Sequence, residues 1–385
     1  MGGERRLGYR PALDGVRGIA IAAVVSMHAF GWPQEGALGV DLFFVLSGFL
    51  ITTLLLEERA GRGSISIAGF YARRARRLLP ALFVMLAAYA AAVVAVFAAR
   101  GDLEHIGGRL LALAATIGYV GNVFRMEGGG IPASLGHLWS LAQEEQFYVL
   151  WPPALILVLR HRPALLTRLL GLAIACVVIE RGVYMGMGST LRVYLGPDTH
   201  SEPILVGCLF AVWFVRDQLR LSDRALSRTA AGSLAGILAT IAFWGPLTRA
   251  LSLGDTGPLY GTPMLTAFAF AAGILIFAGA RGTSPVARLL SVRPLRFLGQ
   301  ISYSLYLWHV PVLVAVGTVG GGGVRAIVSL AASLVLACGS RYLIELPFLL
   351  RRRDARPERS IPRPRLLPHL PAKAETSPLG LELRS

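Results

Sequence analysis

The chain has 385 residues, of which 54% are hydrophobic and 16% are charged, and its mean hydropathy is +0.59. Soluble globular chains carry about 25% charged residues, so this composition excludes an ordinary soluble enzyme and indicates an integral membrane protein. The formal net charge of +16 comes almost entirely from arginines in short stretches between apolar segments. This placement indicates membrane topology and argues against nucleic-acid binding.

Apolar segments recur along the chain and predict an all-α fold, a polytopic transmembrane helical bundle of about ten spans. One of the eleven segments, 107–124, carries Arg109 and Asn122 and is the candidate for a re-entrant segment. We assign residues 8–350 to the transmembrane domain, and the Pro- and Arg-rich residues 351–385 to a disordered cytoplasmic tail. The segments are 17–33, 38–56, 79–99, 107–124, 138–159, 164–181, 203–215, 230–247, 260–280, 297–318 and 324–348.

Arginines also set the expected orientation, because positively charged loops stay on the cytoplasmic side of a membrane. Arginine-rich stretches precede the first segment, follow the second and follow the last. Both chain ends are therefore expected on the cytoplasmic side. The basic start is not followed by a short apolar region with a cleavage site, so we expect the first segment to remain as a span.

The first segment carries ionisable residues inside an otherwise apolar run. Arg17 and His28 are eleven residues apart, which places both on nearly the same helix face, about 16 Å apart along the axis. Asp14 lies one turn before Arg17 and can pair with it. Such residues in a span indicate a functional site. The alternative is an arginine that snorkels from the helix end and a histidine bonded to a neighbouring helix.

The second segment has two polar residues, Asp41 and Ser47, in an apolar run. Ser47 stands next to Gly48, a pair that is also typical of close helix packing. Asp41 is harder to explain by packing, because a carboxylate inside a membrane needs a partner. We expect it to stabilise or orient a cation from the first segment.

A run of arginines precedes the third segment. Its members are spaced in pairs one helical turn apart, so two guanidinium groups can face one ligand. The run is either a cytoplasmic anchor or a clamp for phosphate groups at the membrane surface. The arginines are Arg73, Arg74, Arg76 and Arg77.

The fifth segment contains two adjacent glutamates, Glu144 and Glu145, and His137 stands at its start. Buried carboxylates require cations or protons nearby. The expected topology brings these glutamates to the depth of His28, and a carboxylate that orients a histidine is a common general-base arrangement. We favour Glu145 as the partner of His28.

Further polar candidates lie in the last third of the chain. Ser302, Tyr303 and His309 fall inside the tenth segment, and aromatic anchoring at the membrane interface would explain Tyr303 but not His309. Asp198 precedes the seventh segment and is by default part of a polar loop. The cysteines stand singly in apolar segments without metal-ligand spacing, so no metal site is expected.

Six motifs, in this order, resemble acyltransferase family 3, a family of bacterial membrane proteins, over roughly residues 8 to 350. The resemblance implies transfer of an acyl group, often acetyl, from cytoplasmic acyl-coenzyme A (acyl-CoA) in the bacterial cell membrane. The acceptor would be a hydroxyl of a glycan, a lipid or a small molecule such as a macrolide, with no bound cofactor. The motifs are Arg17-x10-His28, GVDLFFVLSGFLIT, RRARRLLP, HLWSLAQEEQFYVLWP, ISYSLYLWHVP and RYLIELPF.

The resemblance also implies roles for individual residues. Arg17 and His28 would be essential, and the RRARR arginines would engage the CoA donor. The stretch Asp198-Thr-His200 departs from a commoner pattern with arginine in the third position, which leaves acceptor handling there open. Many relatives carry a fused extracytoplasmic esterase-like domain, so we expect this chain to work alone or with a separate partner.

Two classes of function follow from these residues. In an acyltransferase, His28 would act as the general base on an acceptor hydroxyl, or would itself carry the acyl group. In a multi-span transporter or flippase, His28 and the glutamates would form a proton relay. Inverted repeats would support the transporter, and we find none in the sequence.

Overall fold

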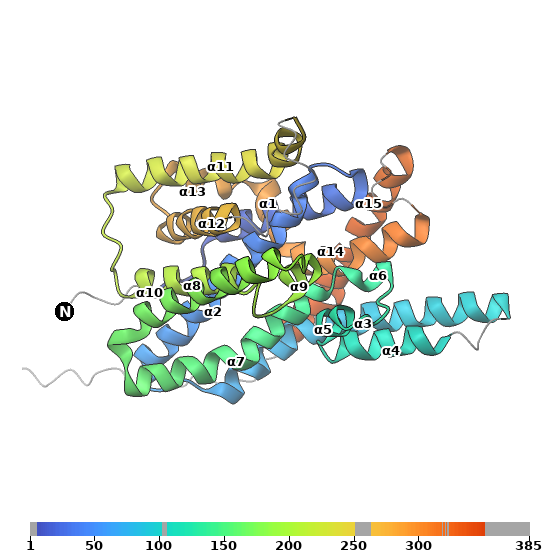
Figure 1. The fold of residues 1–385 in the computed structure, drawn as a ribbon, viewed down its shortest axis with the longest axis horizontal. Coiled ribbons are helices and arrows are strands. Elements are labelled where there is room, and N and C mark those ends of the chain that lie inside the picture. The colour runs from blue at the N-terminus through green and yellow to red at the C-terminus, as the bar shows by residue number, and fades with distance from the viewer. Residues whose placement is uncertain are drawn as a thin grey trace, which may run out of the picture.

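The computed structural model describes residues 6–101, 106–250, 263–317, 319, 321 and 323–350. Within these residues the fold is all-α, without a strand, and most helices run side by side along the long axis (Figure 1). The predicted polytopic helical bundle is therefore confirmed. The predicted tail, 351–385, lies outside the described residues.

The eleven predicted apolar segments each correspond to one or more helices. The bounds, in chain order, are α1 (Pro11–Phe30), η1 (Gln34–Ala37), α2 (Leu38–Arg62), α3 (Ile67–Arg100), α4 (Ile106–Ile117), α5 (Gly121–Met126), α6 (Ala133–Gly136), α7 (Trp139–His161), η3 (Pro163–Leu165), α8 (Leu166–Gly186), α9 (Thr190–Leu195), α10 (Glu202–Val215), α11 (Asp223–Ala250), α12 (Pro263–Arg281), α13 (Pro285–Leu290), α14 (Arg293–Val316), α15 (Gly323–Gly339), η5 (Ser340–Glu345) and α16 (Leu346–Leu350).

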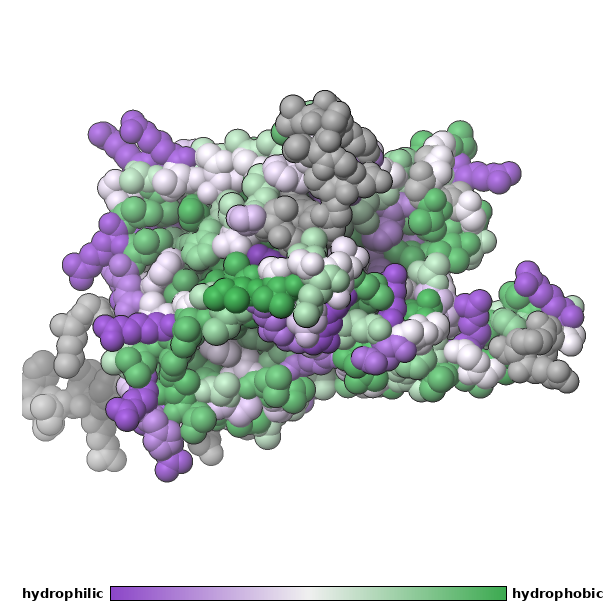
Figure 2. Space-filling model, in the orientation of Figure 1, coloured by the Kyte–Doolittle hydropathy of each residue, from purple (hydrophilic) through white to green (hydrophobic). Residues whose placement is uncertain are grey.

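Seven helices of the described chain are long and apolar enough to cross a membrane. The weakest predicted segment, 107–124, is divided between α4 and α5. A 12-residue helix such as α4 is only about 18 Å long and cannot cross a hydrocarbon core of about 30 Å. Apolar side chains cover much of the visible flank of the bundle, and hydrophilic ones project at both ends of its long axis (Figure 2).

Close helix crossings fix the register at the centre of the bundle. A Cβ at Gly48 of α2 would collide with the backbone carbonyl of Ile204 in α10. A Cβ at Gly299 of α14 would likewise collide with the carbonyl of Asp14 in α1. Small residues allow such backbone contact between membrane helices. The second crossing brings the next turn of α1, with Arg17, against the next turn of α14.

Candidate active site

A cavity of about 750 Å³ follows α2 from Val40 to Arg62. Charged residues surround the end formed by the C-terminus of α2 and the N-terminus of α3, while the walls farther in are mainly apolar. Arg17, Ser140 and Tyr306 belong to the lining at the inner end. The volume falls within the range of about 300–1,000 Å³ that is typical of small-molecule sites.

Not all four arginines of the run in α3 line this cavity. Arg73, Arg74 and Arg77 line it, whereas Arg76 is not among the lining residues. Arg73 pairs with Glu58 at 2.9 Å near the rim, where 45% of its side chain is exposed. Arg77 faces the inside of the cavity. The arginines predicted to bind phosphate therefore lie along one wall of the cavity.

Arg74 forms a bidentate ion pair with Glu145 of α7. Its Nε lies 2.9 and 3.0 Å from the two carboxylate oxygens, and its Nη2 lies 2.5 Å from Oε1. The guanidinium carbon also lies 3.4 Å from the ring centroid of Tyr148. Glu145 is therefore held by α3, and the expected contact between Glu145 and His28 is wrong. Hydropathy indicates depth but does not show which way a glutamate faces around its helix.

Glu144 and Ser47 both line the cavity. The hydroxyl of Ser47 forms a hydrogen bond with the hydroxyl of Tyr148, so this residue does more than permit packing. Tyr303 also lines the cavity, and its hydroxyl donates to the carbonyl of Leu78 at 2.9 Å. The structure thus brings these three predicted polar residues together.

Arg17 points into the inner part of the cavity. Its Nε donates a hydrogen bond to Ser302 Oγ at 3.2 Å, as the crossing of α1 and α14 requires. Asp14 accepts a hydrogen bond from the Tyr9 hydroxyl at 2.8 Å. No ion pair between Asp14 and Arg17 occurs among the described residues.

His28 lies outside the lining of this cavity, in a cluster with two other predicted histidines. Its ring centroid is 5.1 Å from that of His309, which is 5.2 Å from that of His137. The Nδ1 of His28 lies 2.8 Å from the carbonyl oxygen of Val24. A carbonyl only accepts hydrogen bonds, so Nδ1 carries the hydrogen and Nε2 carries the lone pair in the neutral ring.

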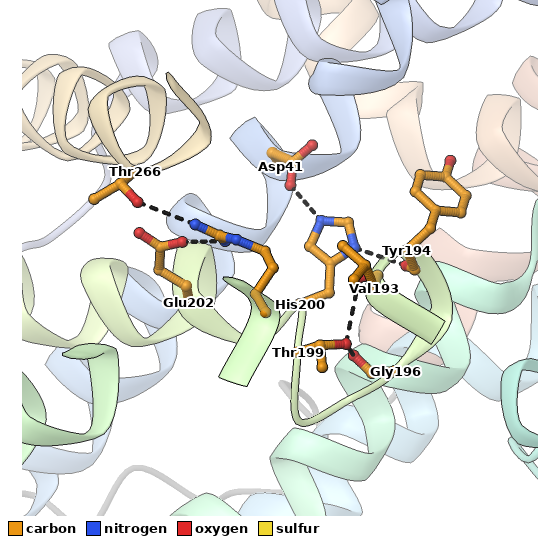
Figure 3. A network of polar contacts seen from close by, with 9 residues as sticks. Asp41, Val193, Tyr194, Gly196, Thr199, His200, Glu202 and Thr266 are labelled. Atoms are coloured by element: carbon orange, nitrogen blue, oxygen red, sulfur yellow. Dashed lines mark hydrogen bonds and ion pairs between the residues drawn. The ribbon is translucent and has the colours of Figure 1, made fainter. Parts of the chain in front are cut away.

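Asp41 belongs to a separate buried network (Figure 3). It accepts a hydrogen bond from His200 Nε2 at 2.8 Å, and His200 Nδ1 lies 2.7 Å from the carbonyl oxygen of Tyr194. The expectation that Asp41 stabilises a cation of the first segment is therefore wrong, because its partner comes from the loop before α10. Asp198 pairs with Arg192, and both remain about one-third exposed.

A second buried group joins α8, α10 and α12. Arg181 forms an ion pair with Glu202 and donates to Thr266 Oγ1 at 3.1 Å. Figure 3 labels Glu202 and Thr266 near the Asp41 network. Sequence reasoning missed this pair, although Arg181 ends an apolar segment. No group of histidine, cysteine, aspartate and glutamate side chains within the described part of the chain could hold a metal ion.

Comparison with known proteins decides the family. The chain matches the family described as "Acyltransferase domain" over residues 10–343. The chain belongs to this acyltransferase family. No solved structure matches it.

Several curated relatives of this chain are named as O-acetyltransferases. The "Peptidoglycan O-acetyltransferase OatA" of Listeria monocytogenes is 33% identical over 88% of this chain and 56% of its own length. The "Putative peptidoglycan O-acetyltransferase YrhL" of Bacillus subtilis is 36% identical over 80% and 49%. The "O-acetyltransferase OatA" of Staphylococcus aureus is 32% identical over 80% and 51%. The chain thus spans about half the length of these relatives.

Three further polar residues belong to the site or its surroundings, and all three lie in motifs identified in the sequence. Ser140 and Tyr306 line the inner end of the cavity, and their hydroxyls lie 2.6 Å apart. Glu345 is buried in the π-helix η5, where it bonds to Ser304 and pairs with Arg341 at 2.9 Å. The sequence motifs contain Ser140, Tyr306 and Glu345, but the sequence does not show the direction in which each of these side chains points from its helix.

Proposed function

We propose that this acyltransferase transfers an acyl group, most simply acetyl, from acyl-CoA to a hydroxyl group of a glycan. The observation that carries the proposal is the cavity along α2, which is arginine-rich at one end, apolar in its walls and lined by Arg17 farther in. The names of the relatives support an acetyl group and a peptidoglycan-type acceptor. Lipid-linked sugars and macrolides carry the same hydroxyl chemistry.

The charged end of the cavity suits the phosphate groups of CoA. Guanidinium groups bind phosphate oxygens in pairs and keep their charge at any physiological pH. Arg73 and Arg77 line this route, and Arg77 makes no ion pair within the described part of the chain. The apolar walls suit the pantetheine arm and the acyl group. Arg6, the first described residue, lines the cavity at this end, so a cytoplasmic N-terminus would place the entrance where acyl-CoA occurs.

The reaction needs a base for the acceptor and a positive group for the thioester oxygen. His28 Nε2 removes the acceptor proton as the hydroxyl oxygen attacks the thioester carbon. The guanidinium of Arg17 stabilises the negative charge that develops on the carbonyl oxygen. The carbon–sulfur bond then breaks, and the thiolate of CoA takes up the proton that His28 received.

The proposal is tested with the full chain purified into lipid nanodiscs. The protein is incubated with acetyl-CoA and, separately, with chitopentaose, an undecaprenyl-linked sugar or a macrolide, and both free CoA and acetylated product are measured. The expected result is CoA release in proportion to an O-acetylated product. In proteoliposomes, which have a closed interior, uptake of an acceptor without consumption of acetyl-CoA would instead establish the transporter. Hydrolysis of acetyl-CoA without an acetylated product would contradict transfer to these acceptors.

A further inference from the structure

Three histidines from distant parts of the chain meet behind the inner end of the cavity. His28 comes from α1, His137 precedes α7 and His309 lies in α14, with His309 in contact with both other rings. His137 is 6% exposed and His309 is fully buried. Polar rings are rarely gathered inside a membrane domain without a function, because each needs hydrogen-bond partners there.

The nitrogens of this cluster are poorly satisfied by the protein itself. His309 Nδ1 lies 2.8 Å from the carbonyl oxygen of Tyr306, so it carries the hydrogen, and Nε2 holds a lone pair. That Nε2 is buried without a hydrogen-bond partner among the described residues. The nitrogens of His137 make no hydrogen bond of good geometry within the same part of the chain, although the backbone carbonyls of Tyr306 and Leu307 lie near its ring. Leaving buried polar atoms unpaired costs stability, which favours a role in the reaction.

Tyr306 separates the histidine cluster from the donor cavity. Its side chain lines the cavity, and its ring centroid lies 5.2 Å from His137 and 5.6 Å from His309. Its hydroxyl donates to the carbonyl of His137 at 2.5 Å and is bonded to Ser140. The cluster therefore begins directly behind the wall where the acyl group of a bound donor would lie.

Catalytic histidines commonly rely on a carboxylate to stabilise their protonated form. His28 has a backbone carbonyl at Nδ1 instead, and Glu145 is held by Arg74. An isolated imidazolium inside a membrane domain is costly. The ring in contact with His28 is His309, whose Nε2 lone pair is available to share a proton.

We propose that His309, supported by His137, is a positioning residue that shares the proton which His28 removes from the acceptor. This inference rests on the proposed function. The proton leaves the acceptor oxygen for His28 Nε2 as the new carbon–oxygen bond forms. His28 and His309 share it through their Nε2 atoms. It passes to the sulfur of CoA when the carbon–sulfur bond breaks, so no other reactant is required.

Two variants of the full chain in nanodiscs separate this role from packing. His309→Phe keeps a ring but removes both nitrogens, whereas His309→Gln keeps an N–H for the backbone carbonyls and an oxygen that accepts a hydrogen bond from a protonated His28. With acetyl-CoA and chitopentaose, we expect kcat of His309→Phe to fall by about 10- to 100-fold with an unchanged KM for acetyl-CoA. His309→Gln should recover much of the loss. Equal kcat for His309→Phe and the wild type would overturn the proposal.

A second measurement does not depend on turnover. In protein labelled with ¹⁵N-histidine, the Nε2 signals of His28 and His309 should move together as one proton is added, and His137→Phe should weaken this coupling. Independent signals would overturn the proposal even if transfer is found. Coupled signals in a protein that consumes no acetyl-CoA would leave the histidine pair established and the proposed function refuted.

Discussion

Two nitrogens of the Arg74 guanidinium donate hydrogen bonds to the carboxylate of Glu145, and the same guanidinium lies against the ring of Tyr148. This contact joins α3 to α7 across the wall of the cavity. Because one donor edge of this arginine binds Glu145 and its face lies against Tyr148, a phosphate group would bind Arg77 more readily. The Arg74–Glu145 pair is therefore a structural contact that holds α3 against α7. Substitutions of the four neighbouring arginines should consequently have different effects.

Glu145→Gln should destabilise the protein by about 1–3 kcal/mol, less than the 3–5 kcal/mol of a fully buried broken pair, because the side chains of Arg74 and Glu145 keep 21% and 16% exposure. Thermal unfolding in detergent measures this loss. Glu58→Gln is the control, since its partner Arg73 is 45% exposed and surface pairs contribute about 0–1 kcal/mol. Equal losses of stability in the two variants would contradict a structural role for the Arg74–Glu145 pair.

Arg77→Gln should raise the KM for acetyl-CoA about tenfold, the effect of losing one charge-assisted contact to phosphate. Arg76→Gln is the matched control on the same turn of α3, because Arg76 does not line the cavity. Initial rates over a range of acetyl-CoA concentrations provide the comparison. If Arg76→Gln raises KM as much as Arg77→Gln, the four arginines act through their total positive charge and not through a specific contact between Arg77 and phosphate.

His28→Ala should lower kcat by about 10²- to 10⁴-fold, the usual contribution of a general base. Binding of acetyl-CoA should remain unchanged, because His28 does not line the donor cavity. Calorimetric titration with a non-hydrolysable CoA thioether measures binding separately from turnover. A variant that keeps the wild-type rate would remove His28 from the reaction.

Asp41→Asn should be tolerated better than Asp41→Leu. An asparagine amide can donate to Nε2 of a neutral His200, whose Nδ1 hydrogen is directed at the carbonyl of Tyr194. Leucine removes this hydrogen bond from a buried site at a cost of about 1–3 kcal/mol. Unfolding temperatures of the two variants test the difference. Equal damage from asparagine and leucine would show that the pair requires the aspartate charge.

Gly48→Ala should prevent normal assembly, because the added Cβ would overlap the backbone of α10 at Ile204. Gly61→Ala lies on the same helix but meets only the end of the Arg6 side chain, at 4.0 Å. It should be neutral or stabilising by up to about 1 kcal/mol through helix propensity. The yield of monodisperse protein after purification compares the two, and a normal yield of Gly48→Ala would disprove the tight crossing.

Hydropathy was sufficient to predict the membrane class and the helices, since an apolar run of about 20 residues has few alternatives in a bilayer. The same pattern could not predict rotation about each helix axis. Arg17 and His28 share one face of α1 as expected, yet only Arg17 lines the cavity. Glu145 faces α3 because of a pairing with Arg74 that is 71 residues distant in sequence. Such pairings depend on which helices become neighbours.

Helix α2 has two faces that make different contacts. Toward the cavity it presents Phe43, Ser47 and Leu50, while Val45 and Gly48 face the crossing with α10. A saturation mutagenesis scan of this helix should therefore give two interleaved phenotypes with a period of about 3.6 residues. One set of positions should alter donor kinetics at normal abundance, and the other should reduce abundance while surviving molecules keep wild-type kinetics.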